Sequence, residues 1–126
     1  SVGIVMTSSK VKRIFSQDVI MDSLEENNGL DIDDTLLTTK PVGAHIIPDM
    51  ELIRMTDSER DEAFQEEGIA DKFDFNLNCR ASSSYHNQRM GVLRLSEYLP
   101  IINDDDKVKE ARLQKYNELK AKPILI

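Results

Sequence analysis

The chain has 126 residues, of which 40% are hydrophobic, enough for one domain with a modest core. Its formal net charge of −7 excludes nucleic-acid binding as the main function, because a phosphate-binding surface needs a basic face. An acidic surface favours basic protein partners instead. No apolar run approaches the roughly 18 residues of a membrane span, so no membrane contact is expected. The lone Cys79 is expected to be a small core residue.

The N-terminal third predicts a strand, a helix and a loosely defined connection. Residues 2–6 are a short apolar run typical of a strand. Residues 10–26 carry a broad apolar surface at helical spacing, and this helix could begin as late as Ser16. The Asn-Asn-Gly at 27–29 predicts its end, since these residues tolerate the left-handed conformation of a C-terminal cap. Residues 30–39 fit either a strand or a loop.

The middle of the chain predicts an irregular segment, a strand and a helix. Residues 40–49 contain two prolines and a glycine, which indicate an irregular segment or an edge strand. Residues 51–55 predict a short strand. Thr56 and Glu59 have the spacing of a capping box, so a helix is expected to follow and to run to about residue 67, before a glycine.

The clearest local pattern is an alternation of apolar and polar side chains over residues 73–79. The odd-numbered residues would face the core and the even-numbered ones water, which is the period of a half-buried strand. Residues 81–91 are expected to form a loop. Residues 92–95 predict a second strand that would pair with 72–80 in a hairpin.

The C-terminal region predicts an amphipathic helix over residues 104–121. Three aspartates lie at its start and two lysines at its end, opposite to the charges of the helix dipole. Val108 and Ala111 share one apolar stripe with Tyr116 and Leu119. Pro123 ends the helix, and an apolar tail follows. We predict that this stripe and tail bind a partner through Tyr116, Leu119, Ile124, Leu125 and Ile126.

One motif suggests chemistry, the Asp-Ile-Asp-Asp-Thr-Leu-Leu at residues 31–37. It resembles the first motif of haloacid-dehalogenase-type phosphatases, Asp-x-Asp-x-Thr-Leu. The resemblance implies Asp31 as the phosphorylated nucleophile and Asp33 as the general acid, on a doubly wound sheet with a downstream Lys and an acidic Mg²⁺ site. That family needs a buried apolar strand before the first aspartate, and residues 25–30 cannot form one. We therefore expect a solvated acidic turn.

The other polar residues predict no catalytic, cofactor or metal site. Residues 31–42 lack the glycine and the final glutamate of an EF-hand calcium loop. His45, His86 and Cys79 are too few to form a zinc set from histidine and cysteine alone. A nucleophile pair of Cys79 and His86 is not favoured, because a junction between a strand and a loop separates them. The aspartates at 104–106 are explained by the start of a helix.

The predicted fold is a single α+β domain over residues 1–126, with about three helices packed on a small mixed or antiparallel sheet and extended terminal segments. Within it, residues 40–49 would be irregular and residues 123–126 a docking tail. Because apolar segments exceed what so small a domain can cover, we expect a non-catalytic interaction or structural subunit of a larger protein assembly. Its partners would be other protein subunits. A viral or phage accessory protein, cytoplasmic or within a virion, would suit these features.

Two alternatives remain open from the sequence. The first is an acidic inhibitor that mimics nucleic acid, because residues 18–34 hold seven acidic residues and no basic one. Residues 49–74 add ten acidic residues against three basic ones. The second is a phosphatase-like enzyme that uses Asp31 and Asp33.

Overall fold

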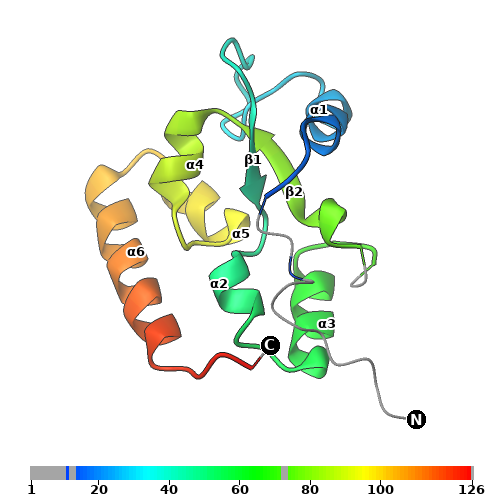
Figure 1. Ribbon diagram of the computed structural model, residues 1–126. Helices are drawn as coiled ribbons and strands as arrows, with labels where there is room; N and C mark the ends of the chain where they lie inside the picture. The colour runs from blue at the N-terminus through cyan, green and yellow to red at the C-terminus, as the bar shows by residue number, and fades with distance from the viewer. Residues whose placement is uncertain (1–10, 12–13, 72–73, 126) are drawn as a thin grey trace.

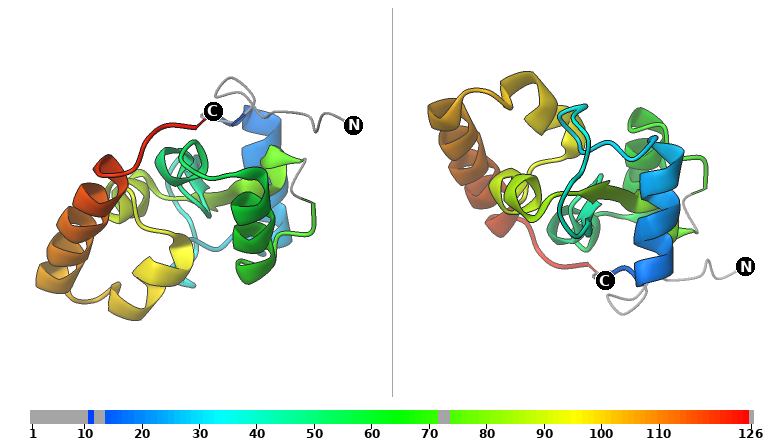
Figure 2. Two further views of the ribbon diagram at one scale, coloured as in Figure 1. Left: turned by 90° about the horizontal axis from the view of Figure 1, so that it is seen from below. Right: turned by 90° about the horizontal axis from the view of Figure 1, so that it is seen from above.

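The computed structural model describes residue 11 and residues 14–71 and 74–125. Within these ranges the chain forms six α-helices and one two-stranded antiparallel sheet, which confirms the predicted α+β class. Figures 1 and 2 show the strands in the middle of the molecule, between α1 (Gln17–Glu26) on one side and α6 (Asp105–Lys120) on the other. The strand expected at residues 2–6 lies outside the described residues.

Two helices begin at the caps that the sequence predicts. The Ser16 hydroxyl accepts a hydrogen bond from the Val19 N–H, so α1 has the later of its two possible starts. α3 (Asp57–Glu66) begins with both bonds of the capping box between Thr56 and Glu59. Each helix is followed by a glycine with a left-handed φ. This is Gly29 after α1, with a φ of +75°, and Gly68 after α3, with a φ of +72°. Local sequence therefore defines both ends of these helices.

The sheet pairs β1 (Val42–His45) with β2 (Cys79–Ser82). β1 falls within residues 40–49, so part of that segment is a strand rather than irregular chain. α1 covers one edge of β2, because the Ser23 hydroxyl donates to the Cys79 carbonyl and accepts from the Ala81 N–H at 2.8 Å. A helix over the edge protects the short sheet from pairing with another chain.

The strand predicted at 73–79 is wrong for most of its length. Residues Phe75–Asn78 form a 3₁₀ turn, η2, whose start is capped by the Asp74 carboxylate, and β2 begins only at Cys79. A 3₁₀ turn places residues i and i+3 on one face, so Phe75 and Asn78 are both buried, whereas Leu77 is 43% exposed. Phe73 lies outside the described residues. The alternation in the sequence thus identifies Phe75 and Cys79 correctly as buried but exchanges Leu77 and Asn78.

Asn78 explains why this turn is stable. Its side-chain amide accepts a hydrogen bond from the Ile47 N–H and donates one to the Ile47 carbonyl, both at 2.8 Å. Its own carbonyl accepts from the Ile46 N–H. The side chain of Asn78 can be buried because both its donor and its acceptor are paired with the backbone of Ile47, as a neighbouring strand would be, just beyond the end of the sheet.

The hairpin predicted between 72–80 and 92–95 does not form, because β2 pairs with β1. The segment expected as a loop contains α4 (Ser84–Met90), which begins where the Ser83 hydroxyl accepts from the His86 N–H. Residues 92–94 of the predicted second strand form a turn instead, and α5 (Leu95–Tyr98) and the 3₁₀ turn η3 (Leu99–Ile101) follow. Arg94 and Glu97 hold the start of α5, with the Arg94 N–H donating to the Glu97 carboxylate.

The strand predicted at 51–55 is also wrong. The segment forms α2 (Asp49–Leu52), a short helix followed by a further turn. Pro48 precedes it with a φ of −58°, a value already suited to a helix start. Leu52 and Ile53 are then both buried in the core between α2 and α3, which alternation in a strand would not allow.

The C-terminal helix is confirmed, and its tail returns to the fold. The Asp104 carboxylate accepts from the Lys107 N–H and caps α6, which buries Val108 and Leu119. Beyond the helix, the Leu125 N–H donates to the Ile53 carbonyl at 2.8 Å. In the described part of the chain, no helix has the length and apolar character needed to cross a membrane.

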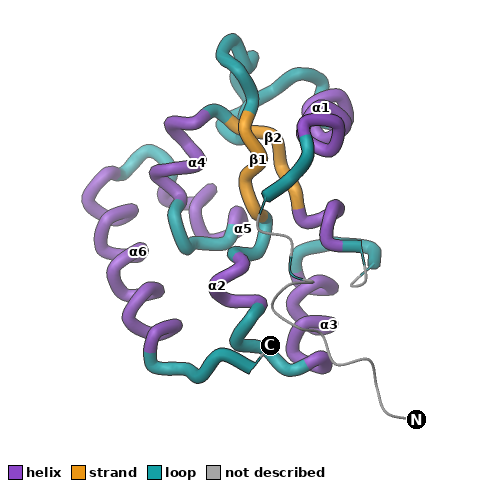
Figure 3. Tube along the Cα trace, viewed as in Figure 1, coloured by secondary structure: helices purple, strands orange, loops and turns teal. Residues whose placement is uncertain are grey.

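Three apolar clusters make up the core. One joins α2 and α3 to η2, and a second joins β1, α4 and α5 to α6. The third lies between α1 and β2. Figure 3 shows that helices dominate around the two strands and that a long loop connects α1 to β1 beside α4. That loop carries the Asp31 motif onto the start of α4.

Candidate functional site

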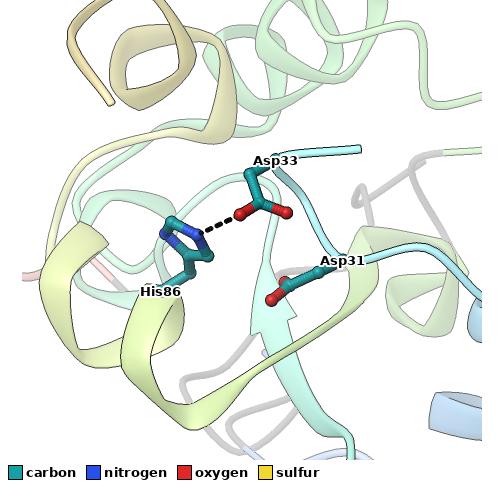
Figure 4. A group of neighbouring side chains, drawn as sticks. All are labelled: Asp31, Asp33 and His86. Atoms are coloured by element: carbon teal, nitrogen blue, oxygen red, sulfur yellow. Dashed lines mark hydrogen bonds and ion pairs between the residues drawn. The ribbon is translucent and has the colours of Figure 1, made fainter. Parts of the chain in front are cut away.

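The start of α4 brings a histidine against the acidic loop. His86 is buried, and its Nε2 lies 3.1 Å from the Asp33 Oδ2. On its other side, Nδ1 lies 2.6 Å from the Tyr98 hydroxyl oxygen. Figure 4 shows the side chains of Asp31, Asp33 and His86 directed toward a common space. Sequence reasoning identified the two aspartates but not His86, because 53 residues separate His86 from Asp33 and no spacing rule connects them.

A chain of hydrogen bonds fixes the orientation of the His86 ring. Arg89 donates to the Tyr98 oxygen at 2.8 Å and also bonds the Ile102 carbonyl and the Asp105 carboxylate. Because Arg89 can only donate, the Tyr98 hydroxyl hydrogen is free to point at Nδ1 of His86. In that arrangement Nε2 carries the ring proton and donates it to Asp33.

The protonation states of Tyr98 and Asp33 agree with this order of donors, from Tyr98 to His86 and from His86 to Asp33. Burial raises the pKa of Tyr98, against the opposing effect of Arg89, so its hydroxyl stays a donor. The hydrogen bond from the Thr35 hydroxyl is the main influence that lowers the pKa of Asp33, and His86 adds to it. Asp33 is therefore a carboxylate at neutral pH, ready to accept from His86 or to bind a cation.

Asp31 is buried, which corrects the expectation of a fully solvated turn. Its side chain reaches the start of α4, where Oδ1 accepts from the Ser83 N–H at 3.0 Å and from the Ile32 N–H at 2.8 Å. Among the hydrogen bonds of the described residues, none uses its Oδ2. The Arg80 guanidinium donates to the carbonyls of Leu30 and Asp31 and holds this loop against β2. Asp33 and Asp34 in the same turn are exposed.

This arrangement differs from the site that the phosphatase resemblance implies. In the described ranges the only sheet is antiparallel and has two strands, and Asp31 follows an isolated bridge between Leu30 and Leu36. The three side chains instead have the composition of a metal-binding group. One ligand atom from each of Asp31, Asp33 and His86 lies within 4.8 Å of the other two.

The remaining candidate ligands lie elsewhere. Cys79 packs in the α1 core cluster, and burial raises the pKa of its thiol to about 11, which disfavours a reactive thiolate. His45 lies on β1 with its ring 4.7 Å from that of Phe15. The structure does not bring Cys79 and His86 into contact as a nucleophile pair would require.

The residues predicted to bind a partner occupy different environments. Leu119 is 3% exposed and packs inside its own chain, so its side chain is not on the surface. Tyr116 is partly exposed, and the Lys120 ammonium lies 5.2 Å from its ring centroid. The side chains of Ile124 and Leu125 are exposed although the Leu125 backbone is bonded to Ile53. Ile126 lies outside the described residues.

Sequence reasoning missed a groove beside Tyr116. It is lined by Gly91, Val92, Lys109, Arg112, Leu113 and Tyr116. Leu113 is 64% exposed at its rim. Leu113 lies about 140° around the helix from Val108, outside the buried stripe of α6, so the apolar pattern of the sequence does not include it.

No protein-family profile matches this sequence, and no curated protein or solved structure shows significant similarity to it.

Proposed function

We propose that the protein is a non-catalytic interaction subunit that docks another protein on the exposed side of α6. This surface, here called the α6 face, consists of Lys109, Arg112, Leu113, Tyr116 and Lys120. The observation that carries the proposal is that Leu113 and Tyr116 are both exposed at one groove. Burial of such apolar side chains under a partner would contribute favourable free energy to binding.

Helical geometry supports a continuous face. At 100° per residue the five side chains fall within an arc of about 100°, which lies directly beside the buried stripe of Val108 and Leu119. Leu113 and Tyr116 lie among three cations. The net charge of the chain is −7, so this basic and apolar strip stands out from the rest of the surface. Its chemistry suits an acidic, amphipathic segment of a partner subunit.

The tail after α6 offers further exposed apolar side chains to a partner. Ile124 and Leu125 present apolar side chains to solvent while the backbone of the tail is held by Ile53. A tail fixed in this way loses less conformational entropy on binding than a free one. The cytoplasm or a virion is the proposed location.

The two alternative functions have less support. An acidic nucleic-acid mimic needs its carboxylates on the surface, but Asp31 is buried and Glu51 is paired with Arg94. A phosphatase-like nucleophile needs a free carboxylate oxygen at the end of a parallel strand, and Asp31 follows no such strand.

The test is capture of the full chain with its partner from the native source. Leu113→Asp should abolish the complex and leave the melting temperature unchanged, because its side chain is largely in water. Met21→Asp is the matched control, since Met21 is 45% exposed on α1 and the charge change is the same. The complex should also weaken as salt is raised, because three cations contribute. A partner that is retained by Leu113→Asp, or lost equally with Met21→Asp, would contradict the proposal.

A further inference from the structure

We infer that Asp31, Asp33 and His86 form a binding site for a divalent transition-metal ion, with Zn²⁺ and Mn²⁺ as the best fits. The geometry already approaches that of a coordination sphere. His86 Nε2 and Asp33 Oδ2 are 3.1 Å apart. Two ligands at about 2.0 Å from a tetrahedral ion are about 3.3 Å apart, so this pair needs almost no movement.

The buried carboxylate is the second, independent observation. Asp31 is 5% exposed, and both of its hydrogen bonds fall on Oδ1, from the N–H groups of Ile32 and Ser83. These bonds orient the carboxylate toward the cluster, where one of its oxygens lies within 4.8 Å of the ligand atoms of Asp33 and His86 (Figure 4). Arg80 places one positive charge near Asp31, and a divalent ion would supply the further charge needed to balance two neighbouring carboxylates.

Each ligand has a supporting group behind it. Metal-binding histidines usually donate their other ring N–H to an oxygen, and Tyr98 provides that oxygen 2.6 Å from Nδ1. Arg89 holds Tyr98 in place from its far side. The Thr35 hydroxyl and N–H fix the other oxygen of Asp33. With a metal on Nε2 the ring proton moves to Nδ1, and Tyr98 changes from donor to acceptor.

The ligand set indicates which ions fit. One imidazole nitrogen and two carboxylate oxygens suit Zn²⁺ or Mn²⁺, whereas Ca²⁺ and Mg²⁺ prefer oxygen alone and Cu⁺ prefers sulfur. Two carboxylates and a neutral imidazole carry a charge of −2, which balances the ion. Three protein ligands also leave at least one position open for water or a further ligand. The Asp33 side chain is 32% exposed and gives the ion a route from solvent.

The experiment is calorimetric titration of the untagged, metal-free full chain with ZnCl₂ and MnCl₂. We expect one ion per chain, with MgCl₂ and CaCl₂ binding at least about tenfold more weakly. Asp33→Asn should weaken binding by at least about 100-fold, because loss of a supporting group alone costs 10–100-fold. Asp34→Asn is the matched control, since it removes the same charge from an exposed neighbour in the same turn.

Two further variants separate a specific site from adventitious binding. Tyr98→Phe should weaken Zn²⁺ binding by about tenfold, whereas His45→Gln should leave it unchanged. With Co²⁺ as a probe, the visible absorption of the bound ion should disappear in Asp33→Asn and persist in Asp34→Asn. No saturable binding, or equal weakening in Asp33→Asn and Asp34→Asn, would overturn the inference. Binding that is lost in His45→Gln would also overturn it.

Discussion

Two polar clusters each contain a buried carboxylate, Asp31 in one and Glu51 in the other, and the surroundings of these carboxylates differ. In the first, Asp31 and Asp33 face an imidazole, and one carboxylate oxygen is left without a donor among the described residues. In the second, Glu51 is 8% exposed and is met by two cations, Arg94 and Lys115. The first cluster has the composition of a metal-binding site. The second, formed around Glu51 by Arg94 and Lys115 and here called the clamp, has the composition of a structural ion-pair network.

The clamp joins four helices. The Arg94 Nε donates to Glu51 at 2.9 Å, and its Nη1 lies 3.1 Å from both Glu66 and Glu67. Lys115 of α6 pairs with Glu97 and lies 3.0 Å from the second oxygen of Glu51, an ion pair not aligned as a hydrogen bond. Permanent cations thus neutralise Glu51 inside the protein. Among the described ion pairs, none joins a lysine or arginine side chain to Asp31 or Asp33, and Arg80 acts on Asp31 through its charge without a direct ion pair.

Removing a cation from the clamp should have the largest effect. Arg94→Met leaves Glu51 buried without its main partner, so we expect a loss of about 3–5 kcal/mol in the free energy of unfolding. Urea denaturation measures it, with the exposed Lys109→Met as control. A loss below about 1 kcal/mol would show that Arg94 does not stabilise Glu51, and the distinction between the clusters would fail.

The second-largest effect is expected from low pH, which should reduce the contribution of the clamp to stability. Burial by itself would raise the pKa of Glu51, but the hydrogen bonds from Arg94 and the positive charges of Lys115 and Arg94 outweigh it and lower the pKa. A lowered pKa in the folded state means that Glu51 stabilises the fold above its unfolded pKa of about 4.3, and that this contribution is lost as pH falls through the folded value. Melting temperatures below pH 5 should therefore fall more steeply in the wild type than in Glu51→Gln. Parallel curves would contradict this assignment.

The variant Tyr98→Phe tests the other cluster, which contains Asp31, Asp33 and His86. It removes the acceptor of Arg89 and the partner of His86 Nδ1 in a place without solvent, since Tyr98 is fully buried. We expect a loss of about 1–3 kcal/mol in thermal or urea unfolding. Tyr85→Phe, which alters an exposed ring beside His86, is the control. An unchanged stability would mean that the hydrogen-bond chain does not position His86.

Deletion of residues 123–126 should have the smallest effect on stability. It removes the bond from the Leu125 N–H to the Ile53 carbonyl and little buried apolar surface, so about 1 kcal/mol is expected. The same deletion should weaken partner capture, because Ile124 and Leu125 are exposed. A large drop in melting temperature with an intact complex would show that the tail only completes the chain's own fold.

The sequence predicts those elements whose signals are local. Ser16, Thr56 and Asp104 cap helices through hydrogen bonds that span three residues, and each cap was identified correctly as a possible helix start. Residues 75–78 could not be predicted in this way. Their conformation depends on Asn78 pairing with Ile47, 31 residues away, and a local alternation carries no information about that partner.

The candidate site shows the same limit. Asp31 and Asp33 are visible as a motif, but their neighbour His86 comes from a segment expected to be a loop. The Ser83 cap that starts α4 is the signal that the sequence offers, but Ser82 and Ser84 on either side conceal which of the three serines acts as the cap. Leu113 was missed because an exposed leucine on a polar helix face has no periodic signature.

The double hydrogen bond of Asn78 has a consequence for chemical ageing. Hydrolysis of its amide to an acid would replace the donor that faces the Ile47 carbonyl with a second acceptor, so two oxygens would oppose each other in a site that is 1% exposed. In the folded chain the amide is shielded from water and held by its two hydrogen bonds to Ile47. A molecule that undergoes this hydrolysis while unfolded would lack the donor that joins η2 to Ile47. Damage acquired in the unfolded state would thus persist as a defect each time that molecule folds again, at the point where β2 begins.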